Sequence, residues 1–172
     1  LCPRTCHILI TFFFSFVMLF LDAAIDAIPN FSVISQIELL CLKTDAATEQ
    51  KVKDIIEPVF TGCNVIITQG FIGATDENES TALGREGSDY SAAIFANLLN
   101  AESQTIWKDV EGVMNADPKQ FADATFIDAL SYTEVIEMAY YGAQVIHPKT
   151  IKPLQNKNIP LHVRCFLQPE LA

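Results

Sequence analysis

Short apolar runs recur along the chain at intervals that leave room for a helix between them. Residues 65–68 are β-branched and lie between Gly62 and Gly70, which predicts a buried strand. Residues 105–107 and 161–166 predict two more strands. Residues 69–78 then read as a loop at the carboxyl end of the first strand, where open α/β sheets bind ligands.

Helical patterns fill the intervals between these strands. Residues 48–59 repeat apolar side chains at helical spacing, and Pro58 is expected to end that helix. Residues 88–99 predict a second helix. Ser131 and Glu134 form a capping box that opens a third, through residue 141, and Pro148 suits the first turn of a fourth, to about residue 155. The alternation predicts an α/β fold with a mainly parallel sheet.

The first thirty residues differ from the rest. Residues 8–21 are almost continuously apolar, which is short of the roughly 20 residues of a membrane span. Arg4 before the run and small residues after it match a secretory signal. We favour a buried strand or helix, or a wrongly joined terminus, over a targeting segment. Residues 1–30 are therefore treated as an atypical segment, and a membrane partner is not expected.

Composition narrows the class of protein. A chain of 172 residues corresponds to about one domain, and its net charge of −10 argues against a nucleic-acid partner. The cysteines are odd in number, scattered and without a C-x-x-C pair, which indicates free thiols in a reducing cytoplasm and no metal site. They are Cys2, Cys6, Cys41, Cys63 and Cys165.

The segment TALGREGSDYSAA (81–93) is suited to holding an anion. Gly84 and Gly87 let the backbone approach a ligand closely, and Ser88 is predicted to cap the helix whose amides then face that ligand. Arg85 can bind a carboxylate or phosphate with its guanidinium fork. An ordinary glycine-rich loop with a good cap is the alternative, since such loops alone are weak evidence.

Two further motifs follow in order, WKDVEGVMNADPK (107–119) and GAQVIHPKT (142–150). Together with the arginine loop they resemble the catalytic domain of aspartokinases, over about residues 65–167. That resemblance implies a three-layer α/β/α sandwich of the amino acid kinase type, incomplete here, with residues 31–172 as the C-terminal part of the domain. It also implies MgATP-dependent phosphorylation of the side-chain carboxylate of L-aspartate, in the cytoplasm.

The resemblance carries roles to matching residues. Arg85 would bind the aspartate carboxylate, although a surface salt bridge is its simpler role, and Glu86, Gly87 and Ser88 would complete the substrate loop. Asp89 matches the catalytic-site carboxylate that orients the lysines of the site; a favourable charge at a helix start is the alternative. His147 precedes Pro148 and is expected to be a helix-entry residue bonded to backbone, not an acid or base.

The nucleotide would contact Lys108, Asp109, Met114, Lys119, Gln144 and Val145. Three of these depart from the commonest family pattern: Met114 replaces an aromatic, Lys119 an arginine and Gln144 a lysine. Lys119 keeps a charge but loses the bidentate fork. Gln144 removes a positive charge near the transferred phosphate, which argues against full activity.

Other family features are not recognisable in the sequence. They are the opening Lys-Phe-Gly-Gly-Thr-Ser motif, an upstream glutamate that binds the substrate ammonium, and the regulatory domains. We therefore expect a fragment that is inactive alone, possibly of an aspartokinase fused to homoserine dehydrogenase. A homo-oligomer is implied by the family only. The alternatives are a non-catalytic nucleotide-binding or subunit-interaction module and, less favoured, a membrane-inserted or secreted protein.

Overall fold

The computed structural model describes residues 7–11, 31–34, 46–62, 65–75, 77, 79–110, 112–143 and 145–167. Within them, β1 (His7–Thr11), β2 (Phe31–Ile34) and β3 (Val65–Gln69) form a parallel sheet in the order β1-β3-β2. The predicted strand at 65–68 is confirmed, and Ile66 and Thr68 are buried on it. The start of the apolar run is thus a strand, while residues 12–30 lie outside the described part.

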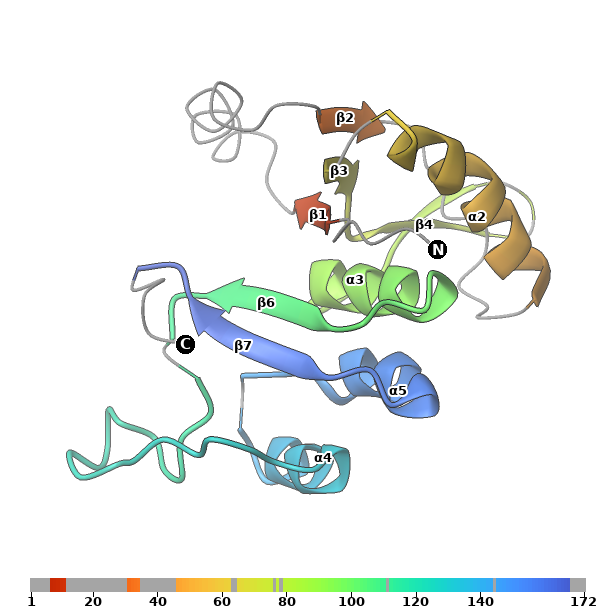
Figure 1. Ribbon diagram of the computed structural model, residues 1–172. Helices are drawn as coiled ribbons and strands as arrows, with labels where there is room; N and C mark the ends of the chain where they lie inside the picture. Colours follow the sequence, from red (N-terminus) through yellow and green to blue (C-terminus); the bar gives the residue numbers. More distant parts are fainter. Residues whose placement is uncertain are drawn as a thin grey trace.

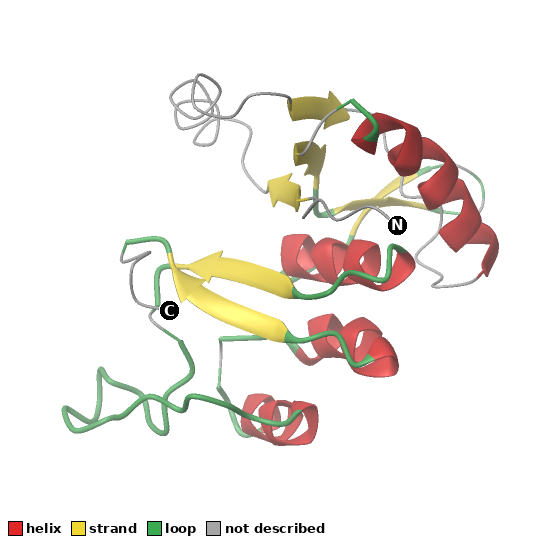
Figure 2. Cartoon of the chain, viewed as in Figure 1, coloured by secondary structure: helices red, strands yellow, loops and turns green. Residues whose placement is uncertain are grey.

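The other described strands form two further sheets (Figure 2). β6 (Gln104–Lys108) pairs in parallel with β7 (Leu161–Cys165), as predicted, and β4 (Ile72–Ala74) pairs antiparallel with β5 (Ser80–Ala82). The prediction of a loop over 69–78 was therefore wrong in part, because β4 falls inside it. The described strands form three sheets and not one continuous sheet. Parallel strands combined with helices nevertheless confirm the α/β class.

The helices follow the predicted pattern closely. They are α2 (Ala46–Phe60), α3 (Gly87–Leu98), α4 (Tyr132–Tyr140) and α5 (Pro148–Lys157). Pro58 does not end α2 at once, since the helix continues to Phe60. Both halves of the capping box at Ser131 and Glu134 are present, and Tyr141 is the C-cap of α4. Among the described residues, none of the helices is long and apolar enough to cross a membrane.

α3 is the central helix of the molecule (Figure 1). It packs against α2 and β3 through one cluster of buried side chains and against α5 through another. Such a helix must be apolar on most of its surface, and its sequence from Ala93 to Leu98 is buried throughout. The first cluster contains Val52, Ile56, Ile66, Ile94, Phe95 and Leu98; the second contains Ala93, Ala96, Leu154 and Ile159.

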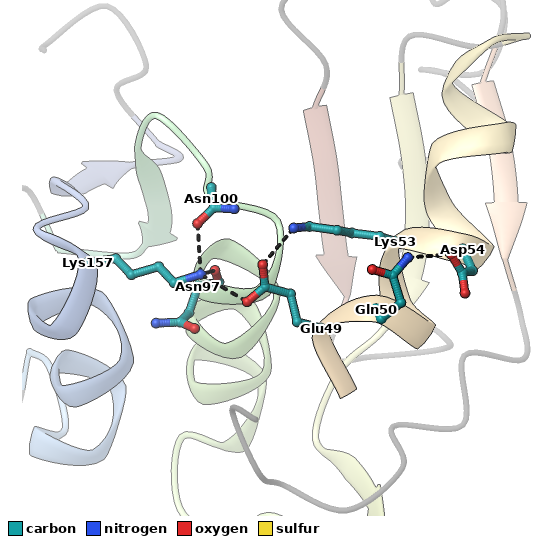
Figure 3. A network of polar contacts seen from close by, with 7 residues as sticks. All are labelled: Glu49, Gln50, Lys53, Asp54, Asn97, Asn100 and Lys157. Carbon is teal, nitrogen blue, oxygen red and sulfur yellow. Dashed lines mark hydrogen bonds and ion pairs between the residues drawn. The ribbon is translucent and has the colours of Figure 1, made fainter. Parts of the chain in front are cut away.

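A polar network joins the same three helices at their surface (Figure 3). The ammonium of Lys157, in α5, donates to the backbone carbonyl of Asn97 at 2.6 Å and to Oδ1 of Asn100 at 2.7 Å. It also contacts the Glu49 carboxylate of α2 at 3.4 Å. Lys157 therefore binds the C-terminal end of α3, where a cation is favoured by the helix dipole.

Candidate active site

The glycine–arginine loop leads directly into α3, but the helix is not capped as the sequence predicted. Glu86 is the N-cap residue, in a left-handed conformation with φ 54°, and its side chain makes no capping hydrogen bond. Ser88 lies one residue inside the helix, so its predicted capping role was wrong. The expected helix start at residue 88 moves to Gly87 for the same reason.

Gly87 is buried and leaves no room for a side chain. A β-carbon there would lie 2.6 Å from Cδ2 of Phe71 and 2.9 Å from Cβ of Leu83. The ring of Phe71 thus packs directly on the backbone of the helix start, and the amide of Leu83 donates to the Phe71 carbonyl at 2.8 Å. A glycine is therefore needed at this position because of the close approach. Backbone conformation does not require it, since the φ of Gly87 is not in the left-handed region.

Ser91 ties this helix start to the segment that follows β3. Its hydroxyl donates to the Gly87 carbonyl at 2.8 Å and accepts from the Phe71 amide at 2.9 Å, and the residue is fully buried. The loop after β3, the β4–β5 hairpin and the start of α3 therefore meet around Phe71 and Ser91. Neither residue was assigned a role from the sequence. Ser91 lies within the recognised motif, but no pattern links it to Phe71.

Three charged side chains meet between the carboxyl end of β6 and the start of α3. The Lys108 ammonium lies 3.1 Å from Oδ2 of Asp89 and 3.9 Å from Oε2 of Glu86. All three side chains are less than one-fifth exposed. Lys108 is half-buried here because alternate residues of β6, Gln104 and Ile106 among them, face inward. The structure thus brings together a predicted nucleotide residue, Lys108, the predicted catalytic carboxylate of Asp89 and one predicted substrate-loop residue, Glu86.

Two other predicted residues, Arg85 and Asp109, are neighbours of this ion pair in the sequence. Arg85 is exposed, immediately before the N-cap, and Asp109 is exposed just after β6. Gln104 donates from Nε2 to the Asp89 carbonyl over a long 3.4 Å, which steadies the first turn of α3 only weakly. An exposed guanidinium beside the first turn of a helix is free to bind an anion there.

The other predicted nucleotide residues lie on the segment after β6 and before α5. Met114 forms a bridge with Phe126, and Lys119 follows a turn in which its amide donates to Oδ1 of Asp117 at 2.9 Å. Val145 is half-buried, and Gln144 lies outside the described residues. Within the described part, no hydrogen bond or ion pair joins Lys108 to Met114, Lys119 or Val145, so the assignment of these residues to one nucleotide site stays a prediction.

His147 takes the structural role predicted for it. It is the N-cap of α5, and its Nδ1 accepts a hydrogen bond from the Lys149 amide at 3.1 Å. Pro148 occupies the first turn, as expected. Within the described residues, no group of three or more His, Cys, Asp or Glu side chains converges to hold a metal. Magnesium bound through nucleotide phosphates does not need such a group.

Comparison with known proteins identifies the fold around this site. The model of the amino acid kinase family matches residues 15–165, which is most of the chain. The chain belongs to the amino acid kinase family. This match agrees with the parallel strands and the central helix described above.

Within the amino acid kinase family, the resemblance to aspartokinases is confirmed. Over 111 residues, 63% of this chain, it is 48% identical to bifunctional aspartokinase/homoserine dehydrogenase 1, chloroplastic, of Zea mays. Over 105 residues, 61% of this chain, it is 44% identical to lysine-sensitive aspartokinase 3 of Escherichia coli. These matches span only 12% and 23% of the relatives' own lengths.

A solved structure shows the same relationship. The crystal structure of E. coli aspartokinase III in complex with aspartate and ADP superposes with a TM-score of 0.72 and 31% identity. The superposition covers 84% of this chain and 34% of that one. The described part of the chain therefore has the fold of an aspartokinase, and it corresponds to about a third of the E. coli enzyme's chain.

Proposed function

We propose that this chain carries the substrate loop and part of the nucleotide site of an aspartate kinase. The reaction would transfer the γ-phosphoryl group of ATP to the side-chain carboxylate of L-aspartate, giving 4-phospho-L-aspartate, the first step of lysine, threonine and methionine biosynthesis. One observation carries the proposal. Lys108, Asp89 and Glu86 meet beside the exposed Arg85, where β6 ends and α3 begins.

Two anions must approach each other in this reaction, so the protein has to supply positive charge and alignment. Arg85 would bind a carboxylate of aspartate in a bidentate manner, and the first amides of α3 would add hydrogen-bond donors. Lys108 would bind ATP phosphate oxygens, held in place by Asp89. An aspartate carboxylate oxygen then bonds to the γ-phosphorus, the bond from that phosphorus to the bridging oxygen breaks, and ADP leaves with the electron pair.

Magnesium would enter with ATP and neutralise charge on its phosphates. Asp109, Met114, Lys119, Gln144 and Val145 would complete the nucleotide contacts. We also propose that residues 31–172 form part of the catalytic domain. The protein would assemble as a homo-oligomer and would be located in the cytoplasm. The word chloroplastic in the maize relative's name makes a plastid the alternative, which fractionation of cells expressing a tagged copy would decide.

The chain by itself is proposed to bind nucleotide and not to turn over aspartate. Gln144 supports this, because it stands where family members commonly carry a lysine. The test is an aspartyl-phosphate assay, trapped with hydroxylamine, together with ATP and aspartate binding. It would compare this chain, its Arg85→Ala and Lys51→Ala variants, and a full-length aspartokinase as positive control.

We expect no turnover by this chain, and aspartate binding that is weakened tenfold or more by Arg85→Ala, the loss of about one charged hydrogen-bonded contact. Lys51→Ala removes an exposed cation from α2 and should change nothing. Turnover that depends on Arg85 would overturn the proposal that the chain alone does not phosphorylate aspartate. Failure of this chain to bind aspartate or ATP, while the full-length enzyme binds both, would overturn the kinase assignment and favour a subunit-interaction module.

That second candidate has an observation of its own. Tyr140 and Tyr141, at the end of α4, are 86% and 87% exposed, and α4 buries none of its residues fully. Large aromatic side chains exposed in pairs are typical of protein–protein interfaces. Sedimentation of the wild-type chain and of Tyr140→Ser/Tyr141→Ser would show whether this surface holds subunits together.

A further inference from the structure

Lys108 has more negative charge around it than its own charge can balance. One ammonium faces the carboxylates of Asp89 and Glu86, so the three groups sum to −1. All three are mostly buried, and charges in such positions are screened less by salt than exposed ones. Any polyanion that binds the Lys108 ammonium therefore competes for it with two carboxylates.

The two carboxylates are not equivalent. Asp89 lies at hydrogen-bonding distance from the ammonium, 3.1 Å, whereas Glu86 lies at 3.9 Å. Oε2 of Glu86 is buried and accepts no hydrogen bond from the described residues. This buried carboxylate oxygen thus lies 3.9 Å from Lys108 without a hydrogen bond of its own, which is costly unless another interaction compensates.

The backbone explains why Glu86 stays in this position. It has φ 54°, a left-handed conformation that is uncommon for residues other than glycine, asparagine and aspartate. It also precedes Gly87, which is packed against Phe71 and cannot move outward easily. The turn therefore fixes the backbone of Glu86 at the start of α3, while Oε2 of its side chain accepts no hydrogen bond from the described residues.

We propose that Glu86 is a resting counter-ion of Lys108, which a polyphosphate must displace before it can bind the lysine. Asp89 keeps Lys108 in place throughout, and Glu86 weakens nucleotide binding by competing for the same ammonium. Glu86 is then a positioning residue that acts through Lys108. The inference rests on the proposed kinase function, because it takes Lys108 to be a phosphate-binding residue.

The test compares wild type, Glu86→Gln and Glu86→Asp for binding of ATP and of inorganic tripolyphosphate. Binding is followed by the fluorescence of Trp107, which is the only tryptophan in the sequence and precedes Lys108. We expect Glu86→Gln to lower the Kd for both ligands by about twofold to fivefold, the size of one partly exposed charge interaction. Glu86→Asp keeps the charge and should bind less tightly than Glu86→Gln.

Two controls separate this effect from a general change. Glu102→Gln removes an exposed carboxylate in the turn between α3 and β6 and should leave the Kd unchanged. In a Lys108→Met background, Glu86→Gln should give no further tightening. A gain in affinity that persists without Lys108, or a Glu86→Gln protein that binds no tighter than wild type at unchanged thermal stability, would overturn the inference.

A second measurement needs no nucleotide. The rate at which an amine-acylating reagent modifies Lys108, mapped by mass spectrometry, should rise in Glu86→Gln by about the same factor as the affinity. An unchanged rate would overturn the counter-ion role. If the rate rises while no variant binds any polyphosphate, the pairing with Glu86 stands and the nucleotide assignment of Lys108 is the part that fails.

Discussion

Gly87 shows how one residue without a side chain can determine the shape of the candidate site. An added β-carbon would lie 2.6 Å from the Phe71 ring, a distance at which something must shift. We therefore expect Gly87→Ala to destabilise the protein by about 1–3 kcal/mol, the usual cost of overpacking. The measurement is thermal unfolding by circular dichroism. Gly62→Ala is the control, because its β-carbon would meet only a carbonyl at 3.9 Å; equal losses in both variants would contradict the packing argument.

Ser91 makes a second prediction at the residue scale. Its hydroxyl accepts from the Phe71 amide and donates to the Gly87 carbonyl, so Ser91→Ala leaves a part-buried amide without this acceptor. We expect a loss of about 1–3 kcal/mol in unfolding free energy. Hydrogen exchange of the Phe71 amide should accelerate, whereas the exposed Ser103→Ala control should leave it unchanged. An unchanged Phe71 exchange rate would show that Ser91 does not couple the two segments.

At the scale of elements, α4 depends on its capping box. The Ser131 hydroxyl accepts from the Glu134 amide, and the Glu134 carboxylate accepts from the Ser131 amide at 2.7 Å. Ser131→Ala should cost about 0.5–2 kcal/mol of unfolding free energy, and the exposed neighbour Thr133→Ala should cost none. Chemical denaturation followed by circular dichroism would measure both. A Ser131→Ala protein as stable as wild type would show that tertiary packing alone holds α4.

The same cap has a pH dependence with a definite sign. Hydrogen bonds from Ser131 lower the pKa of the Glu134 carboxyl below its ordinary value of 4.5. The folded pKa is thus lower than the unfolded one, so this stabilisation is complete above about pH 4.5 and is lost as the pH falls through the folded pKa. Glu134→Gln should reduce the loss of stability between pH 6 and pH 3, a range set by the ordinary carboxyl pKa. Parallel pH profiles for wild type and Glu134→Gln would contradict this.

The elements that the sequence predicted well are those with local signals. The capping box of α4 and Pro148 of α5 act within one turn, so neighbouring residues alone locate both helices. The β4–β5 hairpin was not predicted, because IGA and STA are short and carry little β-branched character. The cap of α3 was predicted wrongly, since Glu86 adopts a left-handed conformation that nothing in its side chain favours.

In the candidate site, the sequence identified residues but not their contacts. The resemblance to aspartokinases assigned Lys108 to the nucleotide and Asp89 to orienting the lysines of the site, and it did not pair the two. The contact of Glu86 with Lys108 was not predicted either, because it depends on the backbone of the turn. The contacts among Phe71, Gly87 and Ser91 could not be predicted either, since a hydrogen bond to a backbone amide twenty residues away leaves no pattern in the sequence.

At the scale of the whole molecule, the question is what holds α2, α3 and α5 together around the central helix. Apolar packing joins α3 to each neighbour separately, in two clusters that share no residue. Lys157, in α5, contacts α2 through Glu49 and the end of α3 through the Asn97 carbonyl and Asn100 (Figure 3). It is therefore a polar link between the two halves of the core, beside the bond from Nδ2 of Asn97 to the Pro153 carbonyl at 2.7 Å.

Two lysines that share one carboxylate allow this link to be tested. Lys53 also bonds Glu49, at 2.6 Å, but within α2, where such pairs contribute only about 0.3–0.5 kcal/mol. Lys157→Met removes three contacts between helices, so we expect it to lower the unfolding free energy by about 1–2 kcal/mol, and Lys53→Met by less than half of that. Urea denaturation of both variants, each also combined with Glu49→Gln, would measure the coupling.

Because the Asn97 and Asn100 contacts persist without Glu49, Lys157→Met should still destabilise the Glu49→Gln protein, whereas Lys53→Met should not. If both lysines instead lose their effect when Glu49 is replaced, the bond of Lys157 to the end of α3 contributes nothing to the stability of the fold.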